Sequence, residues 1–434
     1  GTATVLHRGG YCYAVPKTAE RISGGLPLAF FLFKNNDQEI VQVTTADVSA
    51  GESYRVNPDD WQRWRREQPG DDTQAAIAGR YSAADGEKRY ILFWADTHCH
   101  SIMSPDAEGD PDELIHYAMR NAGLDIAGLV DNDFYPHKTL MQGEWEIKKA
   151  LSRRYSENGR FLCPPAYEYT YHDPSLAPDF NHRCVLHFRG GGLLKRTDPA
   201  ARRIEDVVTA ISPDRSLVYC HHCSYRITDP EVEKNTEAVS SWRVCLEETG
   251  FTLDELKKGR KLGFIGSSDT HRQVPGRGGA LTGVYAEELT PEAVLDAYNN
   301  RRIIATQGSK TAIDFRINDT FIGGTLSIRA DEPVRLACKV IAPSAVEKIS
   351  FFRNGEVYRE TFPNECEAHV SFVDEDALTG SRFYFVRVKL HGDPSLNMGE
   401  AERRGAGALR PFTNKSVYPH NLARARGVYA WSSP

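Results

Sequence analysis

The stretch RYILFWADTHCH, residues 89–100, decides how the middle of this chain folds. Its apolar run ILFW is typical of a strand that is buried on both faces. Directly after that run, Asp96, His98 and His100 occupy alternate positions. Alternate side chains of an extended chain point the same way, so both imidazoles can reach one metal ion at about 2.0 to 2.1 Å. The stretch therefore predicts a strand that ends in a metal site.

Working outward, apolar strands alternate with amphipathic helices over residues 91–310. The best-marked helix has Asp110 as its N-cap and Pro111 in its first turn. Thr290 and Pro291 repeat this pairing before a later helix. Alternation of this kind is typical of a parallel sheet or barrel. We expect an α/β domain over residues 91–310.

The two flanks have a different pattern. Residues 1–90 mix short strand-like runs with a polar stretch and have no repeated strand–helix rhythm, so we expect a β-rich accessory domain there. After residue 310, strand runs separated by turn residues dominate, and RNGE at 353–356 is a hairpin signal. This pattern over about 120 residues predicts an antiparallel β-sandwich for residues 311–434.

Composition limits the classes of function. A chain of 434 residues with 40% apolar content is long enough for two or three domains. The net charge of −6 argues against general nucleic-acid binding, so an anionic substrate must be met by local groups. No stretch approaches the roughly 20 apolar residues of a membrane span. The sequence predicts no membrane span and a small-molecule or oligomeric anionic substrate.

Nine cysteines without a framework spacing favour buried or free thiols and a cytoplasmic location. Because residue 1 is Gly, a removed signal peptide and a periplasmic or secreted location stay open. Cys220 and Cys223 form a CxxC pair, but no second pair follows to complete a zinc ribbon.

Polar residues that can bind metal cluster at the expected strand ends. In chain order they are Asp96, His98 and His100; Asp131, Asn132 and Asp133; Glu168; His182; His221 and His222; and Asp269 and His271. In a β/α barrel such ends converge on one mouth, where the active site lies. Nitrogen and oxygen ligands suit Zn, Mn or Fe, and carboxylate-rich sites commonly hold two or more ions. A single histidine is more often a hydrogen-bonded core residue, but several histidines at successive strand ends favour a metal centre.

These motifs together resemble those of the polymerase and histidinol phosphatase (PHP) superfamily. The resemblance rests on DTHCHS, LVDND, YEYT, CHHCS and GSSDTH, in that order over about residues 91–310, and the chain resembles a subgroup with a C-terminal β-domain. It implies a distorted (β/α)7 barrel with up to three divalent metal ions.

The resemblance also implies roles for individual residues. His98, His100, Glu168 and Asp269 would bind the first ion, with Glu168 bridging to a second. The remaining implied ligands are His182 for the second ion, His221 or His222 for a further position, and His271 with Asp106 for a third ion. Asp106 is the least specific of these assignments, because Asp110 lies close to it in the same loop. Asp110 could be a helix cap rather than a ligand.

One position departs from the family pattern. The family reads Asp-His after its second strand, whereas this chain has Asp131 followed by Asn132. Asn is a weak metal ligand, so either Asp133 or a water replaces the imidazole, or the second site is weakened or empty.

The working hypothesis is metal-assisted hydrolysis of a phosphoester, with a metal-activated water as the nucleophile. Asp131 or Asp269 would accept a proton or orient a ligand imidazole. Arg183 and Arg272, each beside a ligand histidine, are the candidate phosphate contacts. Glycines 190–192 and 276–279 lack phosphate-loop spacing and favour loops at the mouth.

Two alternatives stay open. The metals could serve hydrolysis or elimination on a carbohydrate or another non-phosphate substrate, with Tyr167, Tyr169, Tyr171 and Trp242 stacking on sugars. The other alternative is a non-catalytic binding protein stabilised by a degenerate metal site, which Asn132 favours.

Overall fold

The computed structural model describes most of the chain from residue 80 onward and three short strands before it. The described residues are 3–8, 11–16, 29–31, 80–104, 107, 109–133, 139–170, 182–221, 227–240, 244–248, 250–271, 274–277, 279–329, 331–376, 380–392 and 429–434. The three early strands form an antiparallel sheet of β1 (Ala3–Arg8), β2 (Tyr11–Pro16) and β3 (Ala29–Phe31). Most of the predicted accessory region, residues 1–90, lies outside the described residues.

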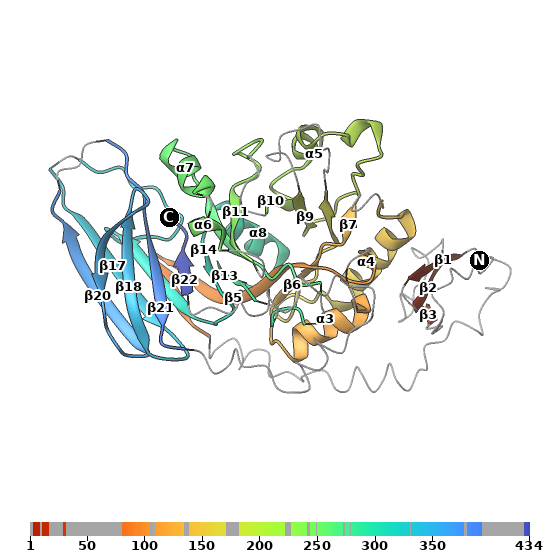
Figure 1. Cartoon of the computed structure of the whole chain (residues 1–434), viewed down its shortest axis with the longest axis horizontal. Helices are drawn as coiled ribbons and strands as arrows, with labels where there is room; N and C mark the ends of the chain where they lie inside the picture. The colour runs from red at the N-terminus through yellow and green to blue at the C-terminus, as the bar shows by residue number, and fades with distance from the viewer. Residues whose placement is uncertain are drawn as a thin grey trace.

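The described part is a mixed α/β structure in which sheets dominate (Figure 1). One sheet has six strands in the order β12-β11-β10-β9-β8-β7. In chain order these are β7 (Asn132–Asp133), β8 (Ala166–Tyr169), β9 (Arg183–His187), β10 (Ser216–Cys220), β11 (Asn235–Val239) and β12 (Gly263–Gly266). Strand β5 (Lys88–Cys99) carries the HxH motif and pairs in parallel with β6 (Ile126–Leu129).

No sheet of the described strands closes on itself, so the predicted (β/α)7 barrel is not shown. The two sheets nevertheless meet at the end of β5, where Cys99 forms an isolated bridge with Thr270 and His100 donates its N–H to the Thr270 carbonyl at 2.9 Å. Strand β9 also departs from an all-parallel arrangement, because it runs antiparallel to both β8 and β10. A parallel pair needs a crossover connection, usually a helix, and the sequence between β8 and β9 has no helical pattern, which fits the antiparallel pairing of these two strands.

Seven short helices pack around these sheets in the described residues. They are α3 (Pro111–Arg120), α4 (Gln142–Tyr155), the 3-10 turn η2 (Pro199–Ala201), α5 (Ile204–Ala210), α6 (Cys245–Glu248), α7 (Phe251–Lys257) and α8 (Pro291–Asn299). Both predicted caps are confirmed: the Asp110 carboxylate accepts from the N–H groups of the first turn of α3, and the Thr290 hydroxyl does so for α8. None of these helices is long and apolar enough to cross a bilayer.

The regular elements in the described residues of the C-terminal part are all strands, and they share a sheet with the α/β part. A nine-stranded sheet contains β4 (Ser82–Asp85), β5, β6, β13 (Leu281–Ala286), β14 (Ile303–Thr306), β18 (Val346–Arg353), β19 (Glu356–Thr361), β21 (Tyr384–Leu390) and β22 (Tyr429–Ser432). A four-stranded sheet contains β15 (Ala312–Ile317), β16 (Thr320–Phe321), β17 (Val334–Ile341) and β20 (Glu367–Asp374). The nine-stranded sheet therefore runs across both predicted domain boundaries, at residues 90 and 310.

Aromatic side chains pack between the two C-terminal sheets. The Phe351 ring of β18 lies 6.3 Å from Phe315 and 4.8 Å from Phe372, which belong to the four-stranded sheet. The predicted hairpin is confirmed, since β18 and β19 pair across Asn354 and Gly355, which both have positive φ.

Candidate metal centre

Most of the predicted ligands meet at one edge of the six-stranded sheet, beside the end of β5. His98 and His100 extend from β5, Glu168 lies on β8, His221 follows β10, and Asp269 follows β12. These side chains are at most 2% exposed. His182 and His271 join them, and His182 reaches the same edge because β9 is antiparallel and begins where its neighbours end.

Four ligand atoms converge in what we call the first group: His98, His100, Glu168 and Asp269. The two histidine Nε2 atoms are 3.1 Å apart, and Asp269 Oδ1 lies 3.2 and 3.1 Å from them. Glu168 Oε2 lies 3.7 Å from His98 Nε2 and 3.4 Å from His100 Nε2. Four ligands at about 2.05 Å from a tetrahedral ion would be about 3.3 Å from one another. The spacing of the first group therefore fits a divalent cation.

The hydrogen bonds of the two rings support this fit. His98 Nδ1 lies 3.3 Å from Glu237 Oε2, and His100 Nδ1 lies 3.0 Å from Ser104 Oγ. We assign the ring protons to these Nδ1 atoms, which leaves an Nε2 lone pair on each ring. Two lone pairs and two carboxylate oxygens then lie near one another, a set of ligand atoms that a cation can bind.

Glu237 is a site residue that sequence reasoning missed. It lies on β11 with no exposed surface, and its Oε2 accepts from Ser267 Oγ at 3.0 Å as well as from His98. A carboxylate behind a ligand histidine fixes the ring's orientation and makes it a stronger ligand. The sequence NTEAV gives little signal for this role, because the strand was not predicted and Glu237 has no metal-binding residue beside it.

Asp131 lies behind His100 and outside the ligand atoms. Its carboxylate accepts from Ser101 N at 2.6 Å, from Ser104 Oγ at 3.0 Å and from Lys148 Nζ at 2.5 Å. Burial by itself would raise the pKa of Asp131, but Lys148 and Ser101 hold that pKa below its usual value. This geometry favours an orienting role for Asp131, through Ser104, over that of a proton acceptor.

Asn132 and Asp133 lie where the chain departs from the family pattern, and Asp133 is a predicted substitute for the missing imidazole. Both residues form hydrogen bonds with neighbouring side chains and backbone. Asn132 Oδ1 lies 3.1 Å from Ser104 Oγ, and its backbone N–H donates to the same hydroxyl at 3.0 Å. Asp133 accepts from Thr139 Oγ1 at 2.7 Å and from Arg196 N at 2.6 Å. Asp133 belongs to no group of His, Cys, Asp or Glu ligand atoms among the described residues.

A second group of ligand atoms consists of Glu168, His182 and His221. Glu168 Oε1 lies 2.9 Å from His221 Nε2 and contacts His182 Nδ1, while its other oxygen belongs to the first group. Burial by itself would raise the pKa of Glu168, but the two imidazoles hold that pKa well below its usual value. Glu168 thus presents one carboxylate oxygen to each of the two groups.

A third group consists of His100, Asp269 and His271. The His271 ring stacks on His100 at 4.2 Å between centroids, and its Nδ1 lies 3.6 Å from Asp269 Oδ1. Burial raises the pKa of Asp269 to about 8, against the opposing effects of His98 and His271. A bound cation would offset that burial and favour the ligand carboxylate. Asp106, the other ligand predicted here, lies outside the described residues, as does His222.

Both predicted substrate arginines lack support from the structure. Arg183 has no exposed surface, and its guanidinium pairs with the buried Glu233 carboxylate and donates to the His182 carbonyl at 3.1 Å. This favours a structural role for Arg183, while a substrate contact stays a prediction. Arg272 lies outside the described residues.

Asp96 ties β5 to the loop that carries Asp269. Its carboxylate accepts from Ser268 N at 2.9 Å and from Gly276 N at 2.7 Å, where Gly276 has a φ of 75°. Glycines 190–192 follow β9 at the sheet edge opposite the three groups, so the prediction of a loop at the mouth is wrong for them. Gly192 O instead accepts from His187 Nε2 at 3.0 Å.

The cysteines follow the sequence prediction in part. Cys99 faces away from the ligand atoms, as predicted, and lies in the core with Sγ 3.7 Å from Ser268 Oγ. Cys220 Sγ lies 3.4 Å from Thr236 Oγ1, and Cys223 lies outside the described residues. The sequence favours thiols over disulfides, and this prediction is wrong for Cys245, which is disulfide-bonded.

Comparisons with known proteins give distant similarities. No protein-family model matches the chain. An uncharacterised protein of Chlamydia pneumoniae is 20% identical over 388 residues, covering 79% of this chain and 57% of that protein, so the chain spans little more than half of this relative. A solved two-domain protein of Bacteroides vulgatus, containing a predicted PHP-like metal-dependent phosphoesterase, is 15% identical, with a TM-score of 0.42 over 69% of this chain and 91% of that one.

Proposed function

We propose that the protein is a metal-dependent hydrolase that cleaves phosphoesters at a centre of two or three divalent cations. One observation carries the proposal: the buried His98 and His100 Nε2 atoms lie 3.1 Å apart, and one carboxylate oxygen of Glu168 and one of Asp269 each lie 3.1 to 3.7 Å from both of them. A protein gains no stability from burying facing lone pairs and carboxylates unless a cation neutralises them. Bound divalent cations would lower the pKa of a water and polarise the phosphoryl oxygens of a substrate.

The residues divide into proposed roles. His98, His100, Glu168 and Asp269 would hold the first cation, and Glu168 would share the second with His182 and His221. His271 would add a ligand to a third cation, together with Asp106. The remaining candidates are His222 as a further ligand, Asp269 as a proton acceptor, and Arg272 as a contact for a small or oligomeric anionic substrate, whereas the buried Arg183 is assigned a structural role. The division of the chain at residues 90 and 310 is likewise our proposal, and it describes regions of the sequence that share one sheet rather than separate folding units.

The second group of ligand atoms favours an enzyme over a non-catalytic binding protein. A purely structural metal site has one closed set of ligands, whereas Glu168 presents its two oxygens to two sets. The carbohydrate alternative loses part of its basis, because Tyr167 and Tyr169 have no exposed surface and belong to the core.

Metal content and phosphatase assays test the proposal. We expect two or more equivalents of Zn, Mn or Fe per chain, and release of phosphate from a panel of phosphomonoesters and phosphodiesters. His98→Ala and Asp269→Ala should lose metal and turnover while the far-ultraviolet circular dichroism stays unchanged. His187→Gln is the matched control, since His187 is a buried histidine at the opposite edge of the sheet, and it should keep both metal and activity.

Two results would contradict the proposal. One tightly held ion and no turnover under any metal condition would favour the binding protein. Metal-dependent cleavage of a carbohydrate or carboxylic ester, without phosphate release from the panel, would favour the other enzyme.

A further inference from the structure

Cys184 is a buried thiol on the ligand side of the six-stranded sheet. It lies on β9 directly opposite Glu168 of β8, and directly opposed residues of paired strands have their side chains on the same face. Glu168 presents its carboxylate to the candidate cations, so Cys184 presents its sulfur to the same space. The opposite pattern holds for Val185, which belongs to the core on the other face.

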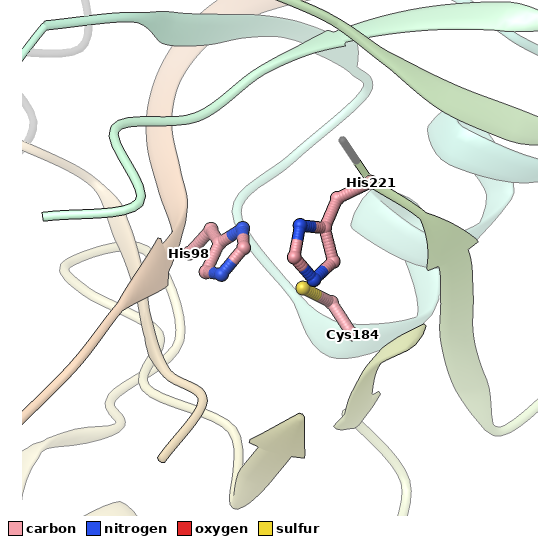
Figure 2. A group of neighbouring side chains, drawn as sticks. All are labelled: His98, Cys184 and His221. Carbon is pink, nitrogen blue, oxygen red and sulfur yellow. The ribbon is translucent and has the colours of Figure 1, made fainter. Parts of the chain in front are cut away.

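Two imidazoles accompany the thiol. His98, Cys184 and His221 each offer one ligand atom, and these three atoms lie within 4.8 Å of one another. Figure 2 shows the Cys184 sulfur pointing toward the two rings. The three side chains are at most 1% exposed, so little solvent reaches this corner of the site.

We propose that Cys184 adds a sulfur ligand to the proposed centre, at the corner where His98 of the first group and His221 of the second group meet, and that the centre therefore selects Zn²⁺ or Co²⁺ over Mn²⁺ or Mg²⁺. Thiolate is a soft ligand that favours zinc, whereas sites of carboxylate and water suit Mg²⁺ and Mn²⁺. Binding releases the thiol proton to solvent, because only the thiolate ligates. The inference rests on the proposed metal centre and goes beyond it by naming a sulfur ligand and the class of cation.

The neighbouring thiols make this assignment specific. Cys99 and Cys220 are adjacent in sequence to candidate ligands, yet their sulfurs contact Ser268 and Thr236 instead. Among the described cysteines, Cys184 is the one that belongs to a group of ligand atoms.

Cobalt spectroscopy tests the inference. We expect Co²⁺ to produce a near-ultraviolet thiolate-to-cobalt charge-transfer band in the wild-type protein and in Cys163→Ala, and Cys184→Ala to lose it. Cys163 is the matched control, because it is a buried free thiol outside the ligand groups of the described residues. The preference for Zn²⁺ over Mn²⁺ in competition binding should also fall, by about tenfold or more, in Cys184→Ala.

A second measurement needs no variant and so does not depend on Cys184→Ala folding. X-ray absorption of the zinc-loaded wild-type protein should show one sulfur neighbour at about 2.3 Å. If metal binds but its neighbours are nitrogen and oxygen alone, or if the cobalt band persists in Cys184→Ala, the sulfur ligand is wrong and the metal centre stands. If the wild-type protein binds no metal, the proposed function itself fails.

Discussion

At the scale of single residues, the candidate centre depends on how each imidazole is held. Both histidines of the HxH motif present Nε2 to the same point, and each has a different partner behind it. His98 has the Glu237 carboxylate, whereas His100 has the Ser104 hydroxyl, which leads on to Asp131. These partners fix the ring tautomers before any cation binds, which reduces the entropy lost on binding.

Glu237→Gln should weaken metal binding by roughly 10- to 100-fold, because an amide oxygen is a weaker acceptor for His98 Nδ1 than a carboxylate. Competition with a coloured chelator measures this affinity. Glu255→Gln is the control, since Glu255 is a buried carboxylate of α7 that pairs with Arg260 rather than with a histidine. Equal affinities in Glu237→Gln and the wild type would show that Glu237 does not support the ligand.

His187 should make stability depend on pH. Burial lowers its pKa to about 4 from 6.5, consistent with its neutral ring accepting from Ser216 Oγ and donating to the Gly192 carbonyl. The unfolded chain therefore binds more protons between pH 6.5 and 4, so stability falls as the pH falls through this window, by about 3 kcal/mol in all.

Urea unfolding at several pH values measures this dependence. The glutamine of His187→Gln does not titrate, so this variant should lack the part of the pH dependence that His187 causes. It should also be somewhat less stable than the wild type at every pH. The same slope in the variant and the wild type would assign the pH dependence to other groups.

At the scale of elements, a buried ion pair attaches helix α4 to the strands that carry the site. Lys148 of α4 is 4% exposed, and its Nζ donates to the Leu129 carbonyl of β6 at 2.7 Å and to Asp131 at 2.5 Å. Asp131 in turn binds the loop after β5 through Ser101. The Lys148 ammonium group, together with Asp131, thus holds a helix, a strand and the ligand loop in a fixed arrangement.

Lys148→Met should lower the free energy of unfolding by about 3 to 5 kcal/mol, because it leaves the Asp131 charge buried without its cation. Urea denaturation gives the value. Lys149→Met is the control: its side chain is 29% exposed and pairs with Glu146 one turn earlier, so the change should be about 0.5 kcal/mol or less. A loss below about 1 kcal/mol in Lys148→Met would mean that the pair contributes little to the fold.

At the scale of the whole molecule, strand β22 joins the α/β part to the C-terminal sheets. It pairs with β14 on one side and β21 on the other. Its Trp431 is 1% exposed and packs in a core cluster that contains Phe264 of β12 and Phe385 of β21. Because the two parts share a sheet and a core, we expect them to unfold together.

Trp431→Ala should lower stability by about 3 to 5 kcal/mol and destabilise both parts at once. Calorimetry measures the transition, and metal release measures the α/β part separately. Phe362→Ala is the control, since Phe362 is 67% exposed and its loss should change stability by about 0.5 kcal/mol or less. Two separate transitions in the wild type would contradict a shared folding unit.

The sequence by itself determined the local features of this protein. The caps at Asp110 and Thr290, the hairpin turn at Asn354 and the shared direction of His98 and His100 depend on neighbours within a few residues. Helix and strand periodicity is likewise local, so the strands that bear most ligands could be found without coordinates.

The tertiary structure alone decided which distant groups meet. The direction of β9, the pairing of Arg183 with Glu233, the Glu237 carboxylate behind His98 and the Cys184 sulfur beside Glu168 all depend on strand pairing between residues far apart in the chain. Sequence periodicity shows which face of a strand a side chain occupies, but not which strand lies beside it, because pairing depends on how the whole core closes.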